Sequence, residues 1–116
     1  MINPQYDNAA ARFKALAHPV RLQVLDLLRG GELCVCHLER ALEKRQAYVS
    51  QQLMVLREAG LVTARKEGLS VYYRISDGII LSQLDAVFGP MKENCPVILP
   101  ACPCPKCRSD KEKGEA

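Results

Sequence analysis

The chain has 116 residues, of which 48% are hydrophobic and 25% are charged, a composition typical of one globular domain. Aromatic residues contribute only 5% and tryptophan is absent, so we expect an aliphatic core. No apolar run approaches the roughly 20 residues needed to span a bilayer. Residues 1–7 lack the basic-then-apolar pattern of a signal peptide, so we expect a cytoplasmic protein without a membrane partner.

Positive charge is concentrated in the middle of the chain, although the net charge is only +3. From Arg40 to Arg74 there are seven basic residues and three acidic ones. A cationic segment between neutral flanks is typical of a polyanion-binding face. The alternative is a solvated surface with scattered charges.

Hydrophobic periodicity predicts four helices in the first half of the chain. The first covers about Tyr6–Leu16. The second begins with Pro19, a residue favoured in the first helical turn, and stops at Gly30-Gly31. The third and fourth cover about Cys36–Leu42 and Gln46–Ala59, with a polar turn between them.

The hydrophobic period changes after Gly60. Leu61–Glu67 and Ser70–Ile75 are rich in β-forming residues and predict a hairpin. Asp77 is placed to cap a final helix, which Gly89-Pro90 should end. One stripe of this helix is too apolar to face water and, together with the first helix, predicts a homodimer interface. The stripe comprises Ile80, Leu84, Val87, Phe88 and Met91.

This order of elements predicts a mainly α fold with a small β-hairpin, the winged helix-turn-helix. In that fold the second helix of the helix-turn-helix enters the major groove of DNA, and the hairpin flanks it. We expect residues 1–92 to form this DNA-binding and dimerisation domain. Residues 93–116 form a tail rich in cysteine and proline, and we expect its charged end to be disordered.

Four motifs stand out along the chain. They are Leu16–Leu22 (LAHPVRL), Glu32–Cys36 (ELCVC), Val49-Ser50 followed by Leu53 and Leu56, and Arg57–Val62 (REAGLV). In this order they resemble the ArsR/SmtB family of metal-responsive repressors, and the resemblance covers about residues 6–88. It implies a homodimer that binds operator DNA when metal-free and releases it when metal-loaded.

The chain departs from the family pattern at three places. Lys44-Arg45-Gln46 replaces a serine that caps the recognition helix in many members, and Gln52 replaces a common histidine. The last helix lacks the Asp/His and His/Glu sets of the zinc-sensing branch. We therefore do not expect the interfacial zinc site of that branch here.

Cys34 and Cys36 form the first candidate metal site. On a regular helix this spacing would place the two thiols on nearly opposite faces. On an extended segment that leads into a helix, both thiols can point the same way, and the helix N-terminus favours the thiolate that metals require. The alternative is that both are small buried apolar residues, as free cysteine often is.

A complete site needs a further ligand. Arsenite and antimonite require three thiolates, whereas Zn(II), Cd(II) and Pb(II) accept three or four ligands. Some arsenic-responsive family members carry a third cysteine where this chain has Glu39, so the missing ligand is His37, unusual for arsenic, or a tail thiol. The tail candidates are Cys95, Cys102, Cys104 and Cys107. These four could also bind a metal by themselves or act as redox-active thiols of a disordered tail.

The DNA contacts are expected on the fourth helix and the hairpin. Residues around the start and outer face of the helix are candidates for base or phosphate contacts, since glutamine can pair with adenine in the major groove. They are Gln46, Ala47, Tyr48, Ser50 and Gln51. Basic residues are expected to make sequence-neutral phosphate contacts. They are Arg57, Arg65, Lys66 and Arg74.

The predicted function is a homodimeric repressor that releases operator DNA when As(III) or Sb(III), or a soft divalent metal, binds its thiolates. The alternative is a thiol-redox-sensing regulator on the same scaffold, with Cys34 and Cys36 or the tail cysteines as a disulfide switch. We do not expect an enzyme, because the chain lacks a Cys-x-x-Cys motif on a βαβ pattern and a Gly-rich phosphate loop.

Overall fold

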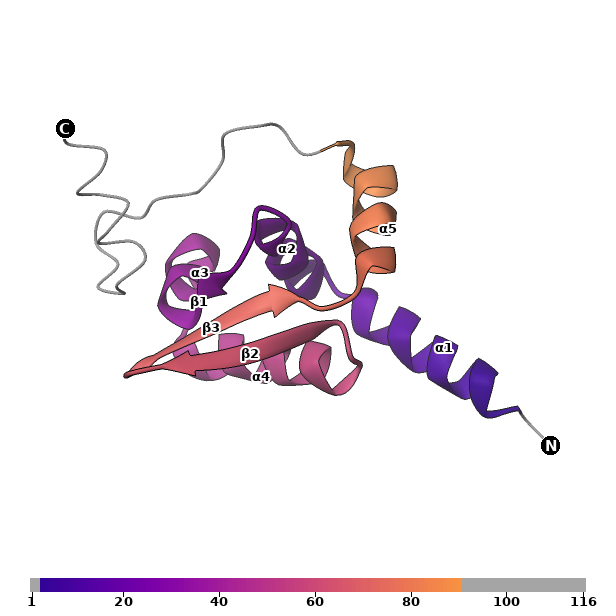
Figure 1. Cartoon of the computed structure of the whole chain (residues 1–116), viewed down its shortest axis with the longest axis horizontal. Coiled ribbons are helices and arrows are strands. Elements are labelled where there is room, and N and C mark those ends of the chain that lie inside the picture. The colour runs from indigo at the N-terminus through magenta and orange to yellow at the C-terminus, as the bar shows by residue number, and fades with distance from the viewer. Residues whose placement is uncertain (1–2, 91–116) are drawn as a thin grey trace.

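The computed structural model describes residues 3–90, so the predictions for Met91 and the four tail cysteines lie outside the described residues. The predicted helices and hairpin strands are confirmed to within two residues of their expected bounds. None of the helices between residues 3 and 90 is long and apolar enough to cross a membrane. The elements, in chain order (Figure 1), are α1 (Pro4–Leu16), α2 (Pro19–Leu28), β1 (Leu33–Cys34), α3 (Val35–Leu42), α4 (Gln46–Glu58), β2 (Val62–Glu67), β3 (Ser70–Ile75) and α5 (Gly78–Phe88).

The sheet has one strand more than the predicted hairpin. β2 and β3 form the hairpin, and β1 adds to the free edge of β3, so the antiparallel order is β1-β3-β2. β1 is only two residues long, with Leu33 opposite Tyr73 and Cys34 opposite Tyr72. A segment this short carries no periodic signal, so sequence patterns predicted its extended conformation but not its pairing partner.

The helix ends follow local side-chain chemistry. Nδ1 of His18 accepts a hydrogen bond from the backbone N–H of Val20 at 3.2 Å, and Pro19 follows as the first residue of α2. Asp77 caps α5 by accepting from the N–H of Ile79 at 2.8 Å, as predicted. The hydrogen bond from the Ile79 N–H lowers the pKa of the Asp77 carboxyl below its ordinary value. The hydrogen bond and positive charge of Arg12 lower it further. The cap is therefore intact at neutral pH and is lost as the pH falls through that lowered pKa.

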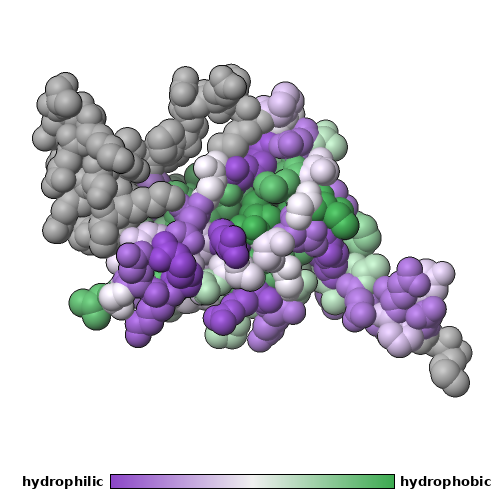
Figure 2. All heavy atoms as spheres, viewed as in Figure 1, coloured by the Kyte–Doolittle hydropathy of each residue, from purple (hydrophilic) through white to green (hydrophobic). Residues whose placement is uncertain are grey.

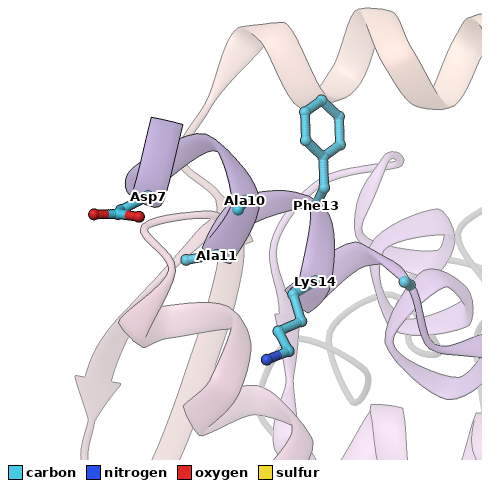
Figure 3. A pocket seen from close by; sticks show the side chains of 6 residues that line it. Asp7, Ala10, Ala11, Phe13 and Lys14 are labelled. Atoms are coloured by element: carbon cyan, nitrogen blue, oxygen red, sulfur yellow. The ribbon is translucent and has the colours of Figure 1, made fainter. Parts of the chain in front are cut away.

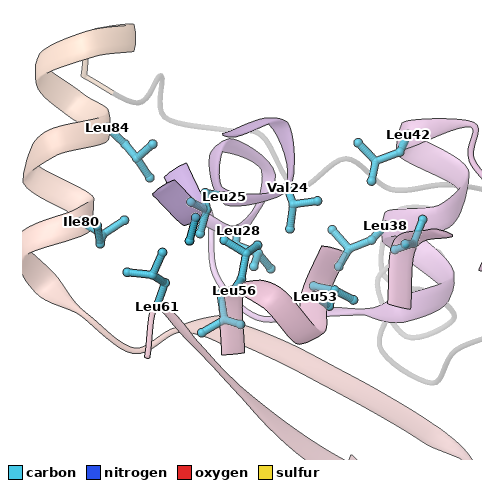
Figure 4. Packing of buried hydrophobic residues seen from close by; sticks show 13 residues of the cluster. Val24, Leu25, Leu28, Leu38, Leu42, Leu53, Leu56, Leu61, Ile80 and Leu84 are labelled. Carbon is cyan, nitrogen blue, oxygen red and sulfur yellow. The ribbon is translucent and has the colours of Figure 1, made fainter. Parts of the chain in front are cut away.

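An aliphatic core joins the helix-turn-helix to the sheet and α5 (Figure 4). Leucines from α2, α3 and α4 meet in its centre and are fully or almost fully buried. These leucines are Leu25, Leu28, Leu38, Leu53 and Leu56. Leu61 and Val62 extend the core toward the sheet, and α5 closes it with Ile80 and Leu84. Because α4 shares this core with α2 and α3, its orientation is fixed by packing on its inner face.

α1 and α5 lie at one end of the domain (Figure 1). Arg29, which follows α2, attaches α5: its Nη1 donates to the Asp85 carboxylate and to the Gly89 carbonyl oxygen, both at 2.8 Å. Arg12 of α1 pairs with Asp77 at the start of α5. The rest of α1 extends away from the domain, and Ala15 is the one buried residue among its 13.

Replacing Leu53 with alanine should lower the free energy of unfolding by about 2–5 kcal/mol, because the change leaves a cavity in the core. Urea denaturation followed by circular dichroism measures this difference. Met54→Ala is the matched control on the same helix, because Met54 is 59% exposed. It should change the free energy of unfolding by less than about 0.5 kcal/mol. Equal losses in the two variants would contradict the orientation of α4.

Candidate functional site

The thiols of Cys34 and Cys36 lie next to each other, with their Sγ atoms 2.6 Å apart. Cys34 ends β1 and is also the N-cap of α3, where its Sγ accepts a hydrogen bond from the backbone N–H of His37 at 3.3 Å. Cys34 is 2% exposed, whereas Cys36, in the first turn of α3, is half-buried. The change from strand to helix turns both side chains to one side, as the sequence predicted.

The thiol pair opens into a groove of about 530 Å³, which we call the thiol groove. Its walls come from the start of α3, the start of α4 and the hairpin. The lining residues are Cys34, Val35, Cys36, Glu39, Gln46, Ser50, Leu69, Ser70, Val71 and Tyr73. Two residues predicted to contact DNA, Gln46 and Ser50, therefore border the same groove as the predicted metal ligands.

The described residues include two of the candidate ligands of the expected soft-metal site, Cys34 and Cys36. Between residues 3 and 90, no three side chains of His, Cys, Asp or Glu are grouped so that they could hold a metal ion. His37 and Glu39 thus do not complete a set of three with the two thiols in this structure. The donor set fits a thiophilic ion in kind, since both donors are sulfur, and the tail cysteines that could complete it lie outside the described residues.

The residues predicted to contact DNA lie at the start and on the outer face of α4. Gln46, Ala47, Ser50 and Gln51 are exposed and Tyr48 is half-buried. Arg45 precedes α4 and makes no side-chain cap hydrogen bond, as the missing serine predicted. The first backbone N–H groups of α4 therefore remain available to a phosphate oxygen, a common ligand of helix N-termini.

The three basic residues of the hairpin differ in their hydrogen-bond partners. Lys66 is exposed, and Arg74 is exposed with its Nε within 3.3 Å of the Thr63 hydroxyl. Arg65 instead lies between two carboxylates: its Nε donates to Glu32 at 3.1 Å and its Nη1 donates to Glu67 at 2.7 Å. The hydrogen bond to Glu32, and to a smaller extent the one to Glu67, raises the pKa of Arg65 above its ordinary value. A phosphate must compete with both carboxylates for this guanidinium.

Cys34, Tyr72 and Arg65 lie in one row across the three strands of the sheet. The sheet register places Cys34 opposite Tyr72 and Tyr72 opposite Arg65. Directly opposed residues of an antiparallel sheet project from the same face. The guanidinium of Arg65 lies over the ring of the buried Tyr72, 4.7 Å from its centroid. One row of side chains therefore crosses the sheet from the candidate metal site to the outer strand.

The exposed apolar surface of α5 differs from the predicted stripe. Ile80 and Leu84 are only 0% and 3% exposed because they pack into the core of the protomer, which corrects their assignment as outward-facing interface residues. Val87 and Phe88 are exposed as expected, and Val87 is 75% exposed. An apolar groove of about 380 Å³ runs between α5 and α1, and Phe13 lines it. Apolar side chains gather on the surface around α5 (Figure 2).

Phe13 is the labelled side chain of α1 that faces α5 in Figure 3. It is 60% exposed. A shallow depression along α1 is lined by small residues, Ala10 and Ala11, with Asp7 and Lys14 at its margins (Figure 3).

Comparison with known proteins identifies the family. Residues 18–64 match the family model described as bacterial regulatory protein, arsR family. The biofilm growth-associated repressor of Agrobacterium fabrum is 42% identical over 88 residues, which cover 73% of this chain and 75% of that protein. The chain belongs to the ArsR/SmtB family. Members of the family are transcriptional regulators, and this protein is a transcriptional repressor of that family rather than an enzyme.

Two further relatives of this ArsR/SmtB repressor bear on its site and fold. The arsenical resistance operon repressor of Escherichia coli is 48% identical over 68 residues, which cover 58% of each chain. The homodimeric winged helix-turn-helix DNA-binding domain of a Mycobacterium bovis regulator has a TM-score of 0.69 and 38% identity. The match covers 73% of this chain and 79% of the Mycobacterium bovis chain. The predicted winged helix-turn-helix fold is thereby confirmed.

Sequence patterns missed three features of this ArsR/SmtB repressor. Glu32 was not expected near the hairpin, because its contact with Arg65 depends on the pairing of β1 with β3. Met54 is exposed on the outer face of α4, seven residues after Ala47 and so on the same side of the helix. Gln52 is buried instead, so it does not belong to that face.

Replacing Glu32 with glutamine should strengthen binding to all double-stranded DNA, because it removes one of the two carboxylates that compete with phosphate for Arg65. The salt dependence of binding should steepen by about one counterion per protomer. Fluorescence anisotropy of labelled DNA at several salt concentrations measures both quantities. Glu58→Gln is the control for net charge, since Glu58 is exposed at the far end of α4. An equal gain in both variants, or a gain that persists with Arg65→Ala, would contradict this role of Glu32.

Proposed function

We propose that this repressor is a homodimer that binds operator DNA through α4 and releases it when a trivalent arsenic or antimony species binds its thiols. The observation that carries the proposal is the adjacency of the Cys34 and Cys36 thiols, 2.6 Å apart, in a groove that α4 borders. The proposed effector ligands and two of the proposed base-reading residues, Gln46 and Ser50, thus line the same groove.

The thiol pair favours a soft effector. Thiolates bind thiophilic ions such as As(III), Sb(III), Cd(II), Pb(II) and Zn(II), and an inorganic As(III) or Sb(III) species takes three of them. Cys34 and Cys36 provide two, and one of Cys95, Cys102, Cys104 and Cys107 provides the third. The likeness to the arsenical resistance operon repressor of Escherichia coli is consistent with an arsenic effector.

In this proposal, α4 and the hairpin have different roles in DNA binding. Gln46, Ser50 and Gln51 on the exposed face of α4 read base edges in the major groove, together with Ala47 and Tyr48. Lys66 and Arg74 on the hairpin neutralise phosphates, and Arg57 does so at the end of α4. Arg65 contributes after it exchanges a carboxylate partner for a phosphate.

Dimerisation follows from the apolar surface of α1 and α5. An isolated helix as short as α1 is marginal in water, yet α1 extends from the domain with Phe13 exposed. Val87, Phe88 and the 64% exposed Ile79 add apolar surface on α5. A second copy that covers both helices removes this surface from water and places two α4 helices for successive major grooves.

One observation favours a second function, thiol-redox sensing. The Sγ atoms of Cys34 and Cys36 are close enough to form a bond with little movement. A peroxide could oxidise the pair to a disulfide, with reduction of the peroxide to water and no thiol from the tail. The same groove would then respond to an oxidant instead of a metalloid.

Val87→Asp should abolish the dimer and DNA binding together, because a carboxylate at an exposed interface position would be buried without a partner. Sedimentation equilibrium at micromolar concentration measures the dimer. Ser82→Asp adds the same charge at another exposed position of α5 and should leave the dimer intact. Leu84→Asp is not a suitable test, because Leu84 lies in the protomer core. A monomeric wild-type protein would rule out this interface.

The variants Cys34→Ser and Cys36→Ser should bind the operator with unchanged affinity. Neither should release it with arsenite, because a serine hydroxyl is a much weaker ligand for As(III) than a cysteine thiolate. Anisotropy of labelled operator DNA in a strictly reduced arsenite titration measures release. The operator is obtained by selection with the metal-free protein from a random DNA pool. Replacement of all four tail cysteines with serine should also abolish release by arsenite. If both single variants still respond to arsenite, the metal site lies wholly in the tail.

A further inference from the structure

Leu69 places a large apolar side chain at the tip of the hairpin, where it is not buried. Its relative exposure is 103%, the highest among the exposed large hydrophobic residues between positions 3 and 90. The tip projects from the domain at the end opposite α1 (Figure 1), and an isolated apolar patch marks it on the surface (Figure 2). We propose that Leu69 inserts between two base pairs from the minor groove and thereby bends operator DNA. This inference rests on the proposed function, in which α4 occupies the major groove.

The turn explains the position of Leu69 but not its apolar side chain. The register pairs Glu67 with Ser70, so the loop between β2 and β3 consists of Gly68 and Leu69. Gly68 has a φ of 61° and Leu69 has no positive φ, which is the pattern of a type II′ turn with glycine at its first central position. Such a turn requires the glycine, whereas polar residues are common at other turn positions. A fully exposed leucine also adds little to the wall of the thiol groove that it borders.

The shape of the tip fits a narrow groove. The minor groove of B-DNA is about 6 Å wide, and the backbones of paired strands lie about 4.8 Å apart. Gly68 has no side chain, so the two-residue loop presents one side chain, that of Leu69, to such a groove. A loop with two large side chains would be too broad to reach the base edges.

Positive charge on both strands of the hairpin matches the phosphates that border the minor groove. Lys66 and Arg74 are exposed, and Arg65 is exposed with its carboxylate partners. Phosphate contacts fix the position of a protein on the duplex. An apolar side chain held between them meets the base stack, and leucine is one of the residues that minor-groove proteins insert to unstack a base step.

The surroundings of Leu69 do not fit a protein partner. Its neighbours at the tip are Glu67, Gly68 and Ser70, so the apolar surface amounts to one side chain. A stable protein interface buries about 800 Å² on each partner, far more than a single leucine offers. The cations of the hairpin would also repel the same hairpin of a second copy. A DNA minor groove fits both the charge and the small apolar area.

Insertion makes the sequence beside each half-site affect binding without a hydrogen bond to it. Pyrimidine–purine steps such as TA and CA unstack at the lowest cost, whereas A-tracts are stiff. An operator with such a flexible step under the hairpin tip should therefore be bound more tightly than one with an A-tract there.

The first test measures bending of the selected operator by the full chain, through energy transfer between dyes at the two ends of the duplex. Saturating wild-type protein should bend the duplex by about 20° or more. Leu69→Ser should reduce the bend and bind with roughly fivefold lower affinity, because it removes the apolar contact. Leu69→Met keeps an apolar side chain of similar size and should retain both. A straight duplex in the wild-type complex would overturn the proposal, as would an equal bend with Leu69→Ser.

A base analogue gives an independent readout of insertion. The fluorescence of 2-aminopurine rises when the base is unstacked, so the analogue is placed at successive positions beside each half-site. Wild-type protein should raise the fluorescence at the inserted step, and Leu69→Ser should not. Lys66→Ala is the matched control on the hairpin: it should flatten the salt dependence by about one counterion per protomer, yet give the wild-type rise at saturation. A rise that persists in Leu69→Ser, or no rise at any position with wild-type protein, would overturn the proposal.

The outcomes separate this inference from the proposed function. Protein that binds the selected operator, loses affinity with Gln51→Ala and leaves the duplex straight retains the proposed DNA binding and loses this inference. Protein that does not distinguish the operator from unrelated DNA loses both. A dimer that becomes monomeric with Leu69→Ser in sedimentation would place Leu69 against a second copy, which also overturns the proposal.

Discussion

The pairing of β1 with β3 is the contact on which the arrangement of this domain depends. It joins two residues that precede α3 to the inner strand of a hairpin that follows α4, so the helix-turn-helix lies between two paired segments. Through this pairing, Cys34 is held at the start of α3 and faces the groove that α4 and the hairpin complete. Without it, the hairpin would be attached to the domain only through its own ends and the core.

The electrostatics of the hairpin follow from the same pairing. Because β1 lies beside β3, the residue before β1, Glu32, reaches Arg65 on the far strand. Ion pairs at exposed positions contribute little to stability, commonly about 0–1 kcal/mol. We propose that their effect here concerns binding, since a phosphate that contacts Arg65 must displace one of these carboxylates. Charge in the loop before the thiol pair thus influences a surface proposed to contact DNA.

The core and the surface divide the helices into two groups. α2, α3 and α4 share buried leucines, so their mutual orientation is determined within one protomer. α1 and α5 contribute only Ala15, Ile80 and Leu84 to that core, carry exposed aromatic and aliphatic side chains beside an apolar groove, and also contact the domain through Arg29 and Arg12. A switch that changes the position of one protomer relative to the other would act on the second group and leave the first intact.

The sequence by itself determined the features that depend on neighbouring residues. Pro19 and Asp77 set the starts of α2 and α5, Arg45 leaves α4 without a side-chain cap, and the step from extended chain to helix brings two thiols together. These features are local, because hydrogen bonds and backbone preferences over a few residues are sufficient to define them.

Only the tertiary structure decided the long-range contacts. The partner of β1, the contact of Glu32 with Arg65 and the burial of Ile80 and Leu84 all depend on segments that are distant in sequence. An apolar stripe on α5 indicates that the helix packs against something, but it does not distinguish the core of its own protomer from a second copy. The hydrophobic effect that drives both is non-directional, so the packed geometry selects which side chains face inward.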